Sequence, residues 1–167
     1  MSIFDTKFRK NKKEYILQSL MAAGAAFLVL VLLDVASNAA VIAALGSSAF
    51  IAFTMPAQDS SSGRKLIGGY LVGIVVGCLC HYLSILPVLQ NIEFIAKNSY
   101  VIFCSLSVGL SVFFMVVTNT EHPPAAGLAM GLFLNRCEPR SVLVVFIGII
   151  CLVAIKTLLR PVLKDLT

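Results

Sequence analysis

The stretch Thr-Asn-Thr-Glu-His-Pro-Pro-Ala-Ala-Gly, residues 118–127, decides how the second half of the chain is expected to fold. A residue that precedes proline is pushed away from helical backbone angles, so His122 is expected to be extended. Proline is tolerated in the first turn of a helix, where its missing N–H would have had no partner. The stretch therefore predicts that a long helix ends near Val117 and that a short helix begins at Pro123 or Pro124.

The composition around this stretch is that of a membrane protein. Of the 167 residues, 59% are hydrophobic and only 13% are charged, and the mean hydropathy is +0.95. Ordinary globular domains carry roughly 25% charged residues. So few polar side chains cannot cover a water-facing surface, which excludes a soluble enzyme, a disordered regulator and an ordinary nucleic-acid binder. The chain is predicted to be an all-α polytopic membrane protein, in contact with membrane lipid and with no nucleic-acid partner.

Apolar runs divide the chain into six segments. Four runs are long enough to cross a hydrocarbon core of about 30 Å: Tyr15–Leu33, Ile67–Leu86, Ser99–Val117 and Ser141–Leu159. Two further segments, Asn38–Met55 and Pro124–Leu134, consist largely of alanine, glycine and serine. Small residues let helix backbones approach closely, so these two segments are expected to lie inside the bundle.

The two halves of the chain repeat one order of elements: a long run, a small-residue segment and a second long run. Three segments per half would place the halves in opposite orientations, as in the inverted repeats of many transporters. If all six segments cross, ten of the thirteen basic residues face the inside; if Pro124–Leu134 only dips into the membrane, nine do. The positive-inside rule thus slightly favours six crossings, and the re-entrant alternative stays open.

The N-terminal residues set the expected orientation and domain boundaries. Five basic residues lie between positions 7 and 13, directly before the first apolar run. This pattern predicts a cytoplasmic N-terminus in the cell (inner) membrane. We expect a basic N-terminus over residues 1–14, a single transmembrane domain over residues 15–160 and a short tail over residues 161–167.

The cysteines indicate neither a metal site nor a disulfide framework. There are five, most of them inside apolar runs, and no Cys-x-x-Cys pair or Cys/His cluster occurs. They are expected to be small buried hydrophobic side chains. No cofactor is expected.

The candidate site residues surround the two expected helix starts. The positive end of a helix dipole favours an anion, which indicates Ser37-Asn38 and His122-Pro123-Pro124 as parts of a binding site near the midplane. Further hydrogen-bonding groups come from Gly46, Ser47 and Ser48 and from Thr118 and Asn119. Glu121 and His122 are the candidates for proton coupling. Two alternatives stay open: Glu121 and His122 are solvated at the membrane surface, and the small residues only pack helices.

Two blocks of this sequence resemble the HPP family of integral membrane proteins. Residues 121–126, Glu-His-Pro-Pro-Ala-Ala, resemble the motif that names the family. Residues 45–50, then Pro56 and residues 66–73, resemble its Gly-Ser block and Gly-Gly-His-type run, with Tyr70 where the family commonly has histidine. The resemblance extends over about residues 24–159. It implies a small helical membrane domain, and plant plastid members of the family are associated with nitrite transport.

These patterns favour a transporter or channel for a small inorganic anion, with nitrite as the first candidate and no enzymatic activity. A chain this small is expected to need further copies of itself to enclose a pathway. One alternative is a membrane scaffold or assembly subunit that transports nothing. The other is an intramembrane serine hydrolase with Ser47 or Ser48 as nucleophile and His81 or His122 as base, which requires the two groups within about 3 Å.

Overall fold

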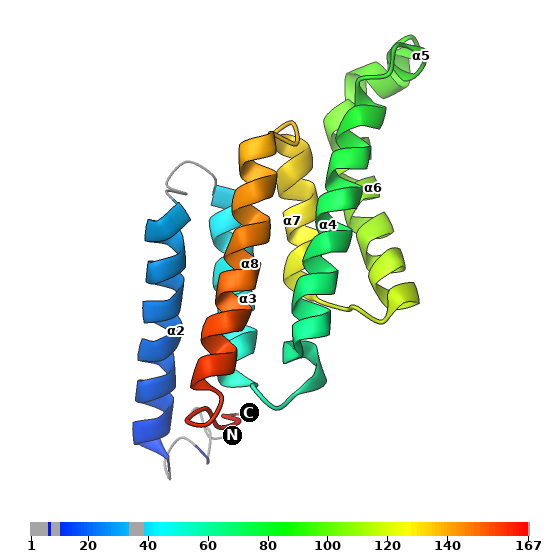
Figure 1. Cartoon of the computed structure of the whole chain (residues 1–167). Coiled ribbons are helices and arrows are strands. Elements are labelled where there is room, and N and C mark those ends of the chain that lie inside the picture. Colours follow the sequence, from blue (N-terminus) through cyan, green and yellow to red (C-terminus); the bar gives the residue numbers. More distant parts are fainter. Residues whose placement is uncertain (1–6, 8–10, 34–38, 167) are drawn as a thin grey trace, which may run out of the picture.

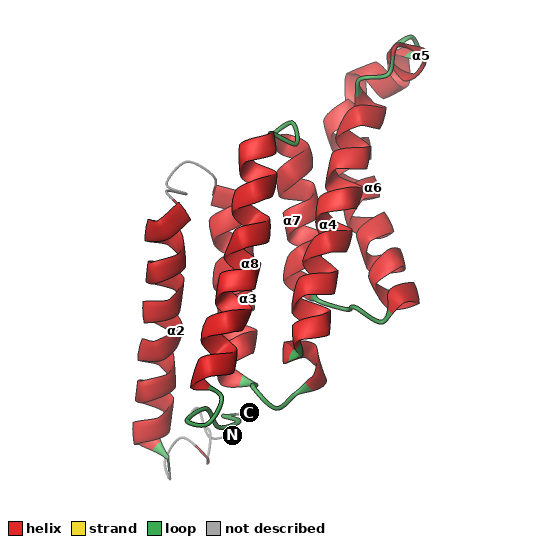
Figure 2. Ribbon diagram, in the orientation of Figure 1, coloured by secondary structure: helices red, strands yellow, loops and turns green. Residues whose placement is uncertain are grey.

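The described part of the protein is a bundle of helices. The computed structural model describes Lys7, residues 11–33 and residues 39–166. Figure 2 shows that this part of the chain consists of helices joined by loops. The elements are α2 (Lys12–Leu33), α3 (Ala39–Thr54), the 3-10 turn η1 (Asp59–Ser61), α4 (Gly63–Ser84), α5 (Pro87–Gln90), α6 (Glu93–Thr118), α7 (Pro123–Leu134) and α8 (Pro139–Leu159).

The prediction of an all-helical chain with long apolar spans is confirmed. Among the described helices, α2, α4, α6 and α8 are long and apolar enough to cross a membrane, whereas α3 and α7 are shorter apolar helices. Apart from the short α5, successive helices alternate in direction (Figure 1). The inverted symmetry between two halves, and crossing by α3 and α7, stay predictions.

The helix ends follow from local sequence. Proline occupies the first turn of α5, α7 and α8. Backbone N–H groups have no intrahelical partner in a first turn, so the N–H that proline lacks is not missed there. The Ser62 side chain accepts a hydrogen bond from the backbone N–H of Lys65 and so caps α4. This cap lets α4 begin four residues before the apolar run that starts at Ile67, so Arg64 and Lys65 belong to its first turn.

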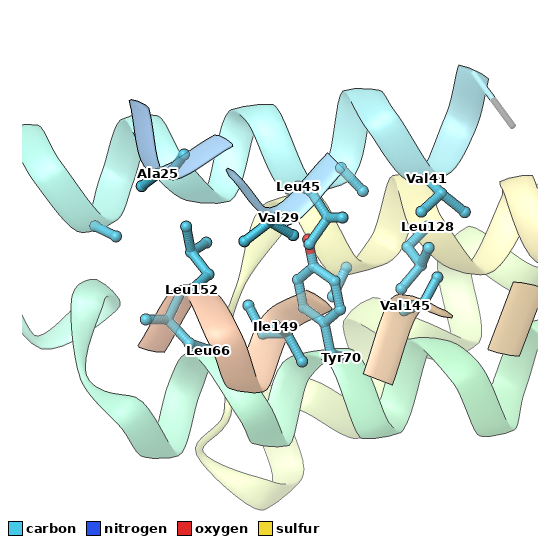
Figure 3. Packing of buried hydrophobic residues seen from close by; sticks show 14 of the residues in the cluster. Ala25, Val29, Val41, Leu45, Leu66, Tyr70, Leu128, Val145, Ile149 and Leu152 are labelled. Carbon is cyan, nitrogen blue, oxygen red and sulfur yellow. The ribbon is translucent and has the colours of Figure 1, made fainter. Parts of the chain in front are cut away.

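The hydrophobic core lies between α2, α3, α4, α7 and α8. In Figure 3 the Tyr70 ring of α4 lies among apolar side chains that include Leu45 of α3 and Ile149 of α8. Helix α7 packs against α4, α6 and α3, and most of its residues are buried. The expected placement of the two small-residue segments inside the bundle therefore describes α7 well, whereas α3 buries only one face.

Three glycines of α4 allow the backbone of α7 to pack closely against this helix. A Cβ added at Gly69 would lie 2.6 Å from the His122 Cβ, and at Gly73 or Gly77 it would lie 2.5 Å from a backbone oxygen of α7. The spacing of four residues places these three glycines on one face of α4. The backbones of α4 and α7 consequently approach as closely as in other small-xxx-small helix pairs.

The beginning of α2 and the end of the chain lie together. The Gln18 side chain is buried and donates to the backbone oxygens of Phe53 and Lys164, each at 2.7 Å. The hydroxyl of Tyr15 donates to the Leu166 carbonyl, and the Leu166 N–H donates to the Thr54 carbonyl at 2.9 Å. These contacts fasten the C-terminal segment under α2 and α3.

Candidate functional site

The connection between α6 and α7 forms the break that the two prolines predict. Asn119 adopts the left-handed conformation with φ 53° and ψ 51°, which asparagine tolerates better than most residues. The backbone N–H of Thr120 donates to the Met115 carbonyl at 2.9 Å, which closes the last turn of α6. His122 is extended, with φ −139° and ψ 95°, and α7 begins at Pro123. The predicted helix start is thus confirmed.

This connection brings His122 to two hydroxyl groups from other helices. The Ser48 Oγ of α3 lies 2.8 Å from the Tyr70 hydroxyl of α4 and 2.8 Å from His122 Nε2. All three side chains are fully buried. The Tyr70 and His122 rings also face each other, with centroids 5.7 Å apart. We call Ser48, Tyr70 and His122 the polar triad.

The polar triad leaves one atom without a partner. Ser48 Oγ has a single proton and lies 2.8 Å from the Ala44 carbonyl as well as from the other two members. Whichever neighbour receives that proton, His122 Nδ1 is buried and has no hydrogen-bond partner among the described residues. Buried polar atoms are usually satisfied, so such an atom indicates strain or a function.

Burial also decides the charge of the imidazole. His122 lies in the connection between α6 and α7, outside the helices, and loss of solvation lowers its pKa to about 4. A polar interaction with the Ser60 backbone opposes this shift, although no hydrogen bond of ordinary length and angle forms to Nδ1 there. The imidazole is therefore neutral near pH 7 in this conformation, and the polar triad carries no net charge.

Charged groups flank the polar triad at the beginning of α4. Lys65 Nζ lies 2.8 Å from Glu121 Oε2 and 2.6 Å from Asp59 Oδ2. The hydrogen bond from Lys65 lowers the pKa of Glu121, whose side chain is 41% exposed. The Lys65 side chain is only 14% exposed, so its ammonium group is largely shielded from solvent.

A second cation lies in the core near this connection. Lys156 of α8 is buried and donates to both the carbonyl and the side-chain hydroxyl of Ser61. Ser61 follows Ser60, whose backbone is close enough to His122 to affect the imidazole. The η1 turn therefore connects the Lys156 ammonium group to the surroundings of His122.

The structure brings together only some of the predicted site residues. Gly46 and Ser47 are exposed, and Ser47 Oγ donates to carbonyls of its own helix, Ala43 at 2.9 Å and Ala44 at 3.0 Å. Thr118 and Asn119 are exposed too, and Thr118 Oγ1 lies 2.8 Å from Thr120 Oγ1.

Of the two expected helix starts, only the one at Pro123 can be described. The other, Ser37-Asn38, lies outside the described residues. Pro123 and Pro124 have no backbone N–H, and the Ala125 N–H donates to the His122 carbonyl at 2.9 Å. The beginning of α7 thus offers an anion its dipole and the His122 side chain, with few of the free N–H groups of an ordinary helix start.

Tyr70 belongs to the polar triad although its residue type did not indicate a site residue. In the sequence, only its position where the family commonly has histidine pointed to it.

The expectation of unpaired cysteines is wrong for Cys78 and Cys137, which form a disulfide with Cα atoms 5.1 Å apart. Their pairing depends on the approach of α4 to the α7–α8 turn, which residue spacing does not show. Among the described residues no three His, Cys, Asp or Glu side chains gather as metal ligands.

Comparisons with known proteins agree with the motif. The family model of the HPP transmembrane region matches residues 8–165. A protein of Dictyostelium discoideum, described only as a transmembrane protein, is 32% identical over 89 residues, which are 53% of this chain and 28% of that protein. The chain thus matches less than a third of that relative's length. No solved structure matches the chain significantly. With its four long apolar helices, the chain is an integral membrane protein that belongs to the HPP transmembrane family.

Proposed function

We propose that this chain is a transporter or channel for a small inorganic anion, with nitrite as the first substrate to test, and that it is not an enzyme. The observation that carries the proposal is the unpartnered Nδ1 of His122, fully buried between apolar helices. Intramembrane ionisable residues are expensive and generally mark pathways or binding sites. Members of the polar triad come from α3, α4 and the α7 start, so an anion held there would contact three elements at once.

A buried cation near the η1 turn supports an anion as the ligand. Lys156 is buried and donates hydrogen bonds to two oxygens of Ser61, while its charge interacts with that of Asp165. We place the anion on the Nδ1 side of His122, where an imidazole N–H and the positive potential of Lys156 would favour it. Neutral donors suit transport, because binding must be weak enough for the ion to leave again.

Proton coupling at His122 follows from the same geometry. Without an anion, burial keeps the pKa of the imidazole at about 4, so a proton seldom binds alone near neutral pH. A neighbouring negative charge favours the charged imidazolium, so anion and proton would bind together. Glu121 already forms an ion pair with Lys65, which lowers the pKa of the carboxyl. We therefore rank His122 above Glu121 as the coupling group.

The test is nitrite uptake into sealed proteoliposomes that contain the purified full chain, at two luminal pH values. Nitrate, formate and chloride serve as competitors. His122→Asn retains an amide near the Nδ1 position and His122→Gln retains one near Nε2, so a site at Nδ1 predicts more residual uptake for the asparagine variant. Ser48→Ala and Tyr70→Phe are expected to reduce uptake at least severalfold.

Matched controls come from the neighbouring exposed residues. Ser47→Ala removes the adjacent hydroxyl of α3, and Tyr82→Phe removes an exposed hydroxyl of α4. Both variants are expected to transport like the unmodified chain. Saturable uptake that persists unchanged in Ser48→Ala and in every His122 variant would remove the polar triad from the pathway. No uptake of any anion above empty liposomes would favour a scaffold or assembly subunit.

Orientation and pass number form part of the proposal. The beginning of α2 and the C-terminal segment lie at one end of the bundle, joined by the Tyr15–Leu166 contact. Lys12, Lys13, Arg64 and Lys65 in the first turns of α2 and α4 lie at this end together with Lys164, as the positive-inside rule expects for a cytoplasmic face. We infer six crossings with both chain ends in the cytoplasm. A membrane-impermeant thiol reagent applied to a cysteine introduced at exposed Arg160 tests the inference, and labelling from outside intact cells would contradict it.

One observation favours a second candidate function. Ser48 Oγ and His122 Nε2 are 2.8 Å apart, which satisfies the distance for a nucleophile and its base. An intramembrane hydrolase would also need a group that orients the imidazole, but Nδ1 has no partner and Ser48 is fully buried. A fluorophosphonate that labels the unmodified chain but not Ser48→Ala would support the hydrolase over the transporter.

A further inference from the structure

A cavity of about 510 Å³ lies at the far end of α4 and α7 from the polar triad. Its walls come from the last turn of α4, the end of α5, the first turns of α6, and the end of α7 with the turn that follows it. The twelve residues of α7 separate it from His122 by about 18 Å. Figure 1 shows α5 at this end of the bundle, away from the beginning of α2 and from the C-terminal segment. Neither the proposed transport nor its polar triad uses this cavity.

Unpartnered polar groups line the cavity. The side chains of His81, Ser99, Tyr100 and Arg136 have no hydrogen-bond or ion-pair partner within the described part of the chain. No described lining residue is acidic, so Arg136 supplies the fixed charge. Four groups able to donate hydrogen bonds, one of them a permanent cation, together fit an anion. Guanidinium groups bind phosphate through two parallel hydrogen bonds.

The turn after α7 holds Arg136 in an unusual backbone conformation. Arg136 and Cys137 have φ values of 55° and 47°, a left-handed region that residues with a side chain seldom occupy. The Cys137 N–H donates to the Leu132 carbonyl at 2.8 Å, and the disulfide to Cys78 fastens the turn to α4. Residues held in such conformations concentrate at binding and catalytic sites. The turn therefore places a permanent cation at the cavity by a constrained backbone rather than by a flexible loop.

The rest of the cavity wall combines an apolar part, which includes Phe133, with two hydrogen-bonded polar residues, Ser84 and Gln90. The Phe133 ring lies 6.1 Å from the Tyr100 ring and 6.4 Å from His81, measured between centroids. A volume of about 510 Å³ lies within the range of sites for organic ligands. Val88 and Phe94, two residues along the chain from the lining residues Gln90 and Ala96, are 76% and 70% exposed, so the elements that carry the lining also expose apolar side chains. The ligand should thus combine an anionic group with an apolar body.

We propose that this cavity binds a phosphate ester with an apolar body, its phosphate on Arg136 and His81 and its apolar part over Phe133 and Tyr100. An acidic phospholipid and a soluble organic phosphate are the two sources of this chemistry. The exposed apolar residues beside the cavity favour the phospholipid. Nitrite transport is not required for the binding, so either proposal can fail without the other.

The experiment is calorimetric titration of the delipidated full chain in a non-ionic detergent. The probes are dihexanoyl phosphatidic acid, phenyl phosphate and inorganic phosphate. Arg136→Gln is expected to weaken binding of the ester probes at least tenfold. Arg140→Gln is the matched control, because it changes a basic residue in the first turn of α8 that does not line the cavity. This variant is expected to bind like the unmodified chain. Circular dichroism verifies that both variants remain helical.

Each outcome decides the proposal. Tighter binding of phosphatidic acid than of phenyl phosphate assigns the site to a lipid, and the reverse order assigns it to a soluble ester. The proposal is overturned if neither ester binds, if inorganic phosphate binds as tightly as both esters, or if Arg136→Gln binds them unchanged. If Arg136→Gln does not fold, Ser99→Leu fills the cavity from α6 and must weaken binding of the ester probes to the same extent.

Discussion

Replacement of Gly69 by alanine tests directly whether His122 packs against the backbone of α4. A Cβ at this position would lie 2.6 Å from the His122 Cβ and 3.0 Å from the Thr120 carbonyl oxygen. Non-bonded carbon atoms settle at about 3.5–4.0 Å. Neither contact can yield by rotation of a flexible side chain, because both atoms belong to or adjoin the backbone. Gly69→Ala must therefore move the α6–α7 connection by about 1 Å relative to α4.

Two effects of opposite sign determine the change in stability. Extra atoms in a close-packed core cost about 1–3 kcal/mol, and removal of a helical glycine returns about 0.5–1 kcal/mol. The expected net loss is about 1–2 kcal/mol. The site should change more, because a shift of about 1 Å takes the 2.8 Å contact between Ser48 and His122 out of hydrogen-bond range.

The assay is unfolding by sodium dodecyl sulfate in mixed micelles, followed by the helical circular dichroism signal. Gly127→Ala on α7 and Gly109→Ala on α6 are matched controls, because a Cβ at either position meets nothing within 4 Å. They are expected to be neutral or to gain up to about 1 kcal/mol, the opposite sign from Gly69→Ala. If Gly69→Ala is as stable as Gly127→Ala and takes up nitrite like the unmodified chain, the close packing of His122 on α4 is refuted.

Three further predictions concern other parts of the described structure. Alkylation of the denatured, unreduced chain should modify three of the five cysteines and reduction should raise this to five, whereas five adducts without reduction would exclude the Cys78–Cys137 bond. Gln18→Leu removes three hydrogen bonds between a buried amide and the backbone, and it should lower the free energy of unfolding by about 1–3 kcal/mol, with faster proteolysis of the C-terminal segment. Since Lys65 lowers the pKa of Glu121 from its ordinary 4.5, their ion pair stabilises the fold above pH 4.5 and loses its contribution as pH falls through the lowered pKa. Glu121→Gln should flatten the stability profile in that acid range, and an unchanged profile would contradict the ion pair.

Local chemistry made the helix break predictable from the sequence. Two consecutive prolines cannot continue α6, and they begin α7 at Pro123 as expected. The long spans were also located to within a few residues, since a run without charge is visible directly. The observed helix ends differ from the predicted ones where polar or charged residues continue a helix beyond the apolar run. Glu93, for example, begins α6 ahead of the run predicted to start at Ser99.

The sequence does not show whether Ser47 or Ser48 faces the candidate site. Adjacent residues of a helix point about 100° apart, so only one hydroxyl can face Tyr70 and His122. In a soluble protein the polar face of α3 would show which side is buried. Here the exposed face contains Gly46, Ser47 and Phe50 and is nearly as apolar as the buried one, so periodicity carries little information.

The three elements that carry the polar triad do not pack equally closely against one another near it. Tyr70 and His122 belong to α4 and to the beginning of α7, whose backbones meet at three glycines and are fastened further along by the Cys78–Cys137 disulfide. Ser48 comes from the second half of α3. This helix packs closely against α7 near its own beginning, where a Cβ added at Gly131 would clash with the Ala40 Cβ, whereas a Cβ added at Gly46 would meet nothing within 4 Å. Close backbone packing leaves little room for one helix to slide past another. An anion that reaches His122 is therefore expected to enter by movement of the Ser48 half of α3 away from the α4–α7 pair, with the Ala40–Gly131 contact retained, which would break the hydrogen bond between Ser48 and His122 Nε2 first.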